Sequence, residues 1–120
     1  SVAEMSETEL IPTQFAYQIL RKLSAGNLVQ VSRGALGGCA LSCDLDATSL
    51  YDLMGVMGER GVLCACMEPG YECRWQDEHG RCAIHCQLAA LQRKQDEAFR
   101  AVSLRRLLTG KSDPQDTSEL

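Results

Sequence analysis

Apolar positions recur at helical spacing in the first part of the chain. Ser1 and Glu4 have the spacing of a capping box, so a short helix is expected over residues 1–10. A second helix is expected from Pro12, because proline suits the first turn of a helix, and Gly26 is expected to cap its end. Two short helices separated by a tight turn are typical of a helix-turn-helix.

The pattern changes from helical spacing to alternation after the second helix. Val29 and Val31 share one side of a predicted strand, and a glycine-rich turn follows at residues 33–38. Residues 39–41 can then return as a second strand. A β-hairpin directly after a helix-turn-helix has the layout of a winged helix, so residues 1–45 are predicted to form this unit.

Helical spacing returns in the middle of the chain and ends before the C-terminus. Ser49 and Asp52 form a second capping box, which predicts a connecting helix within residues 46–63. Residues 110–120 are polar and contain Pro114, so they are predicted to form a disordered tail.

A longer apolar stripe begins near Ala83, with alternating spacings of four and three as in a coiled coil. A single exposed helix with such a stripe usually needs a partner, although it could instead pack on its own domain. Residues 83–109 are therefore predicted to hold a dimerisation helix and a short terminal helix capped by Ser103. The predicted fold is mainly α: a winged helix-turn-helix with a two-stranded wing and a long C-terminal dimerisation helix. The stripe consists of Ile84, Leu88, Leu91, Gln95, Ala98 and Val102.

Composition narrows the class of protein. The 120 residues, of which 45% are hydrophobic, are enough for one ordinary domain. No apolar run approaches the roughly 20 residues of a membrane span, and no secretory signal opens the chain. We therefore expect a cytoplasmic protein without a membrane partner, and a segment upstream of Ser1 because the chain does not begin with Met. No acid–base pair or nucleophile set indicates an enzyme.

Five of the seven cysteines and both histidines lie between residues 64 and 86. Thiolate and imidazole donors are what an iron–sulfur cluster or a zinc ion requires. Cys82 and His85 are three residues apart near a predicted helix start, so they share a face. Besides an iron–sulfur cluster, a zinc site and unligated thiols are the alternatives.

The order of these parts resembles the Rrf-type winged helix-turn-helix transcription regulators, the group of IscR, NsrR and CymR, without the family's N-terminal helix. The likeness covers residues 1–108 and rests on SVAEMSETELIPTQFAYQILRKLSAGNLV, VSRGALGGCAL and CMEPGYEC…CAIH. It implies a homodimeric DNA-binding regulator that senses iron–sulfur, nitric oxide or redox status through the cysteine-rich loop at 64–82. The ligands that it implies are Cys66, Cys73, Cys82 and His85, with Cys64, His79 and Cys86 as further donors nearby. This implied set of three thiolates and one imidazole favours a [2Fe–2S] cluster over a [4Fe–4S] one.

A polar stripe on the second helix is the candidate DNA-contact surface. A recognition helix turns such a face into the major groove, although any solvated helix has polar residues. The family motif places Arg33 at the wing tip, where it could enter the minor groove. The net charge of -4 gives no independent argument for nucleic acid, and the alternative function is an interaction module with structural zinc. The candidate contact residues on the helix are Thr13, Gln14, Tyr17, Gln18 and Arg21.

Overall fold

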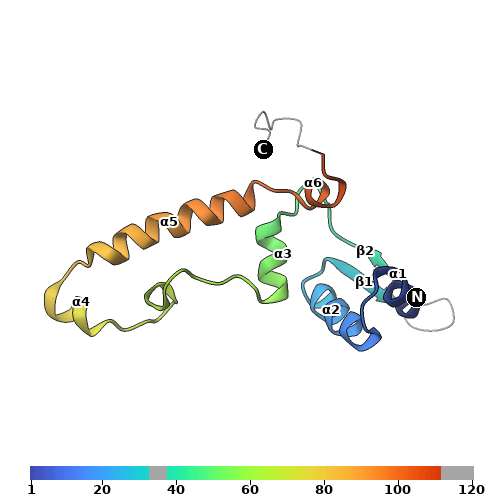
Figure 1. Cartoon of the computed structure of the whole chain (residues 1–120), viewed down its shortest axis with the longest axis horizontal. Helices are drawn as coiled ribbons and strands as arrows, with labels where there is room; N and C mark the ends of the chain where they lie inside the picture. Colours follow the sequence, from blue (N-terminus) through green and yellow to red (C-terminus); the bar gives the residue numbers. More distant parts are fainter. Residues whose placement is uncertain (33–37, 112–120) are drawn as a thin grey trace.

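The computed structural model describes residues 1–32 and 38–111, and its helices outnumber its strands there (Figure 1). The two strands form one antiparallel hairpin. No helix in this described part is both long and apolar enough to cross a bilayer. The elements in chain order are α1 Val2–Glu9, α2 Thr13–Ala25, β1 Val29–Ser32, β2 Gly38–Leu41, α3 Leu50–Met57, η1 Ala65–Met67, α4 Arg74–His79, α5 Ala83–Arg100 and α6 Leu104–Thr109.

Helices α1 and α2 form the predicted helix-turn-helix. The backbone N–H of Glu4 donates to the Ser1 hydroxyl at 3.2 Å, as the capping box requires. Leu10 ends α1 in the left-handed conformation, and α2 starts directly after Pro12. The Thr13 hydroxyl donates to the Ser6 hydroxyl at 3.1 Å, which fixes the corner between the two helices.

The hairpin after α2 confirms the predicted wing. Strand β1 pairs with β2 in a register that sets Val29 opposite Leu41 and Val31 opposite Cys39. The Cys39 thiol lies 3.8 Å from the Met5 sulfur, so the wing rests on α1. Arg33, the predicted wing-tip contact, lies outside the described residues.

The start of α6 is fastened to the start of α3, although they are far apart in sequence. The Leu50 N–H donates to the Val102 carbonyl and the Leu104 N–H donates to the Thr48 carbonyl, both at 2.8 Å. Leu104 is among the few buried apolar residues of the described chain. The predicted caps at Ser49 and Ser103 are both present, each accepting from the N–H three residues on. These bonds hold the start of α6 against the start of α3.

Gly26 sits where α2 touches α3. It ends α2 with a φ of −87°, and the left-handed conformation falls on the next residue, Asn27. A Cβ atom at Gly26 would lie 2.6 and 2.7 Å from the two methyl carbons of Val56. The glycine is therefore required by the close approach of α3 more than by the geometry of the cap.

We expect Gly26→Ala to lower the free energy of unfolding by about 1–3 kcal/mol, because the new methyl group overpacks the contact with Val56. Denaturant unfolding followed by circular dichroism measures this. Gly61→Ala is the matched control, since open space surrounds it, and it should be neutral or gain up to about 1 kcal/mol. A double variant with Val56→Ala should recover part of the loss; equal stabilities for all variants would contradict the role of this contact.

The molecule is elongated, and α5 projects from the winged-helix half (Figure 1). Its radius of gyration is 19.1 Å, whereas a compact domain of this length has about 14 Å. The 18 residues of α5 span about 27 Å. Ile84 is 71% exposed and Leu91 52% exposed, so part of the predicted stripe has no cover within this chain.

The cysteine-rich segment differs from the expected loop. It contains the short turn η1 and a helix, α4, over Arg74–His79. Arg74 and Glu78 form an ion pair at 3.1 Å across one helical turn, and Gly80 ends the helix with a φ of 84°. The eight residues between Cys73 and Cys82 are therefore ordered as a helix and a turn.

Candidate functional site

Cysteine and histidine side chains gather where η1 meets the N-terminal end of α5. The Cys66 sulfur lies 3.1 Å from the His85 Nδ1 atom and 3.5 Å from the Cys64 sulfur. All three residues are half-buried. Cys66 and His85, which are 19 positions apart in sequence, are thus in contact. The implied ligand set requires these two residues to lie close together.

Cys82 joins this group from the helix start. It is the N-cap of α5, and its sulfur accepts a hydrogen bond from the His85 backbone N–H at 3.4 Å. The expected proximity of Cys82 and His85 therefore comes from a cap, with Cys82 just outside the helix. Cys73 occupies the corresponding N-cap position of α4.

The thiols in this group influence one another. The pKa of Cys64 is lowered, chiefly because its sulfur accepts hydrogen bonds from the backbone N–H and the thiol of Cys66. The pKa of Cys66 is raised, first by its hydrogen bond to Cys64, then by desolvation and by the charges of Cys64 and Cys73. Among residues 1–32 and 38–111, no three Cys, His, Asp or Glu side chains converge closely enough to hold a metal ion as placed.

Two further donors have other partners. The Arg81 Nε–H donates to the Cys86 sulfur at 3.1 Å, and this contact raises the pKa of the arginine. The His79 ring stacks on Trp75 at 4.7 Å between centroids, and its Nδ1 lies 3.0 Å from the Trp75 carbonyl oxygen. Cys86 and His79 therefore each contact a residue four or five positions away in the chain.

Gln92 fastens the cysteine-rich segment to α5. Its side-chain oxygen accepts from the Leu63 N–H at 2.7 Å, and its amide donates to Asp96 at 3.0 Å. Leu63 directly precedes Cys64, so this bond fixes where η1 begins along α5. Sequence reasoning missed Gln92, because nothing in its local pattern distinguishes it from other polar residues of a helix.

Tyr51 of α3 lies between two arginines, one from the connection before the cysteine-rich segment and one from the end of α5. The guanidinium groups of Arg60 and Arg100 lie over its ring, at 3.6 and 4.1 Å from the centroid. Arg60 also donates to the Tyr51 carbonyl at 2.6 Å. Since Lys22 of α2 donates to the Met57 carbonyl at 3.4 Å, α3 contacts both the cysteine side and the helix-turn-helix.

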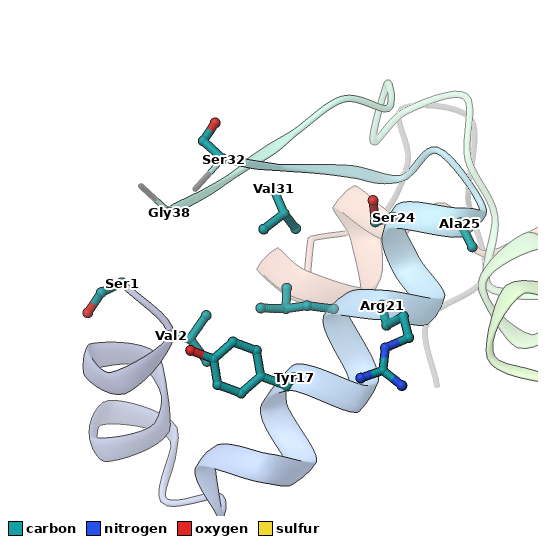
Figure 2. Close-up of a pocket in the computed structure, with 10 residues that line it drawn as sticks. Ser1, Val2, Tyr17, Arg21, Ser24, Ala25, Val31, Ser32 and Gly38 are labelled. Atoms are coloured by element: carbon teal, nitrogen blue, oxygen red, sulfur yellow. The ribbon is translucent and has the colours of Figure 1, made fainter. Parts of the chain in front are cut away.

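The polar stripe on α2 is solvent-exposed, in agreement with its predicted orientation. Beside it lies a depression of about 890 Å³ between α1, α2 and the hairpin (Figure 2). Tyr17 reaches from α2 toward Val2 of α1, while Val31 of the hairpin borders the opposite side. Of the stripe, Tyr17 and Arg21 line this depression, and Thr13 is tied to α1 through Ser6.

Comparison with known proteins agrees with this arrangement. A family model described as "Rrf2: Iron-dependent Transcriptional regulator" matches residues 1–110. The fold is similar to that of T. potens IscR, with a TM-score of 0.63 and 16% identity over 99% of this chain and 75% of that one. It is also similar to CymR (YrzC), the global cysteine regulator of B. subtilis, with a TM-score of 0.64 and 18% identity over 93% and 79% of the two chains. No curated protein matches the chain. The winged helix-turn-helix and the family match together show that the chain belongs to the Rrf2 family of transcriptional regulators.

Proposed function

We propose that the chain acts in the cytoplasm as a homodimeric DNA-binding regulator that senses iron–sulfur, nitric oxide or redox status. The observation that carries this proposal is the contact of Cys66 with the His85 ring, next to Cys82 at the start of α5, in an Rrf2 fold. In this proposal residues 1–45 bind DNA, and residues 46–63 connect this part to the cysteine-rich segment. Residues 64–82 hold the cluster that responds to the signal, and residues 83–109 form the dimer.

The donor set fits an iron–sulfur cluster in its chemistry. Cys66, Cys73, Cys82 and His85 would supply three thiolates and one imidazole, which favours [2Fe–2S] over [4Fe–4S]. When bound, such a cluster supplies a redox centre whose potential depends on its ligands and on solvent exposure. The contact of Cys66 with His85 supports this ligand set. Cys73, the N-cap of α4, is near enough to Cys66 for its charge to raise the pKa of that thiol.

The contacts around the segment support a route from the cysteines to α2. Gln92 of α5 bonds to the residue before Cys64, Arg100 at the end of α5 lies over Tyr51 of α3, and Lys22 joins α3 to α2. Ordering of residues 64–82 would favour one placement of α3, and through it one placement of the recognition helix. In a two-fold dimer, two such helices would meet the half-sites of a palindromic operator.

The proposal is tested by purifying the full chain without oxygen. We expect a coloured protein with visible absorbance, iron and acid-labile sulfide, and duplex binding whose affinity changes when the cluster is removed. A colourless protein with stoichiometric zinc and no salt-sensitive duplex binding would favour the interaction module instead, because the same four donors suit a Cys₃His zinc site.

Arg21→Ala should weaken binding to the DNA upstream of the protein's own gene. Arg21 is exposed on α2 beside the depression, where it can neutralise one phosphate. We therefore expect the slope of log affinity against log salt to fall by about 1 per chain. Fluorescence anisotropy at several salt concentrations measures the slope.

Arg93→Ala, which removes the same charge from α5, is the control. Equal slopes for the two variants would show that Arg21 does not contact DNA.

A further inference from the structure

Cys64 and Cys66 form a close pair of thiols at the start of η1. Their sulfur atoms are 3.5 Å apart, with only Ala65 between the two residues in sequence. Cys64 has an extended backbone, and the tight turn of Ala65–Met67 follows it. Both thiols are half-buried, whereas Leu63 and Ala65 on either side of Cys64 are exposed, so a small solute can reach the pair.

We propose that Cys64 and Cys66 are a dithiol modification site, which a hydroperoxide converts into an intrachain disulfide. This disulfide takes the Cys66 sulfur away from His85 and out of the donor set. The disulfide can form from the two thiols alone. The effect on regulation, which is the loss of Cys66 as a ligand, rests on the proposed function. Cys64, which has no place in the implied ligand set, thereby acquires a role.

The reaction balances with a hydroperoxide as the oxidant. The sulfur of Cys64 attacks the outer peroxide oxygen, the O–O bond breaks, and the products are a sulfenic acid and water or an alcohol. The Cys66 thiol then attacks the Cys64 sulfur, the S–O bond breaks, and the hydroxyl leaves as water with the thiol proton. Two electrons pass from the two sulfurs to the peroxide.

The positions of the other thiols favour this pair. A disulfide needs the sulfurs at about 2.05 Å, so the pair must close by about 1.5 Å. Cys86 is held by Arg81, and Cys82 accepts from the His85 N–H. A bond that closes so small a loop is readily reduced, which suits a reversible modification.

Peptide mapping of the full chain tests the proposal. The chain is reduced, freed of metal with a chelator and treated without oxygen with one equivalent of hydrogen peroxide. Free thiols are then alkylated. Trypsin and a glutamyl endopeptidase release residues 61–72, which contain Cys64 and Cys66 and no other cysteine. We expect this peptide to lose two hydrogens in mass and both alkylation sites, and to recover them after dithiothreitol.

Two variants give the comparison. Cys64→Ser should lose the internal disulfide, whereas Cys86→Ser should keep it, because Arg81 holds that thiol elsewhere. Alkylation of both Cys64 and Cys66 after peroxide, or a bond from Cys66 to Cys73 or Cys82, would overturn the proposal. The peptide mapping is done without a cluster, so it tests the disulfide alone. Whether the reduced chain takes up iron and sulfide is a separate result, which tests the proposed function.

Uptake of iron and sulfide measures the consequence. The oxidised chain should take up no cluster under anaerobic reconstitution without a reductant, and should regain the uptake of the reduced chain after dithiothreitol. Equal uptake before and after reduction, with the disulfide present in the peptide, would show that Cys66 is dispensable and would overturn the second half of the proposal.

Discussion

Cys82→Ser is expected to lower the iron and sulfide retained per chain by at least about tenfold. Loss of a group that only supports a ligand already costs about 10–100-fold in metal affinity, and Cys82 is proposed as a ligand itself. The serine hydroxyl should replace the sulfur as the N-cap of α5, because serine is among the preferred residues at that position. Reconstitution without oxygen, followed by iron and sulfide analysis, measures the loss.

Cys86→Ser is the matched control for that variant. Cys86 lies one helical turn after Cys82 and is bonded to Arg81, so its loss should leave the iron content unchanged. Circular dichroism should give the same helix content for both variants. Full iron content in Cys82→Ser would show that Cys82 is not a ligand. An equal fall in Cys86→Ser would show that the cluster depends on Cys86 as well.

The elements that the sequence predicted well are those held by short-range bonds. The capping boxes at Ser1 and Ser49 and the cap at Ser103 join residues three positions apart, so local spacing is enough to identify them. The wing was predicted from alternation beside a glycine-rich turn. Helix α4 was not predicted, because Cys73 and Cys82 were interpreted as ligands on one loop. The spacing of Arg74 and Glu78 and the position of Gly80 are nevertheless typical of a short helix.

The candidate site could be predicted only in part. The cysteine and histidine residues of the site, and its position between the wing and α5, were predicted from the sequence. The contact of Cys66 with His85 agrees with the ligand set that the family resemblance implies. The ligand assignments and the DNA-contact residues stay predictions. The bond from Gln92 to Leu63 spans 29 residues and depends on how η1 lies along α5, which no local pattern specifies. The pairing of Cys64 with Cys66 depends in the same way on the turn between them.

The exposed apolar side of α5 is the proposed dimer surface. Leu91→Glu is expected to raise the dissociation constant of the proposed dimer by about 100-fold or more. Burying a leucine side chain contributes about 1.5–3 kcal/mol, and two-fold symmetry counts each leucine twice. The new carboxylate would also have to be desolvated in the interface. Sedimentation over a range of concentrations measures the dissociation constant, and binding to a palindromic duplex should fall with it.

Arg93→Glu is the control for this variant. It changes the charge of α5 by more than Leu91→Glu does, but it lies about half a turn away from Leu91, off the apolar stripe. It should therefore leave the dimer intact. Since Leu91 is 52% exposed within the single chain, Leu91→Glu should also unfold at a denaturant concentration close to that of the parent monomer. A monomeric parent chain, or a dimer that tolerates Leu91→Glu, would show that the exposed stripe of α5 does not form the dimer interface.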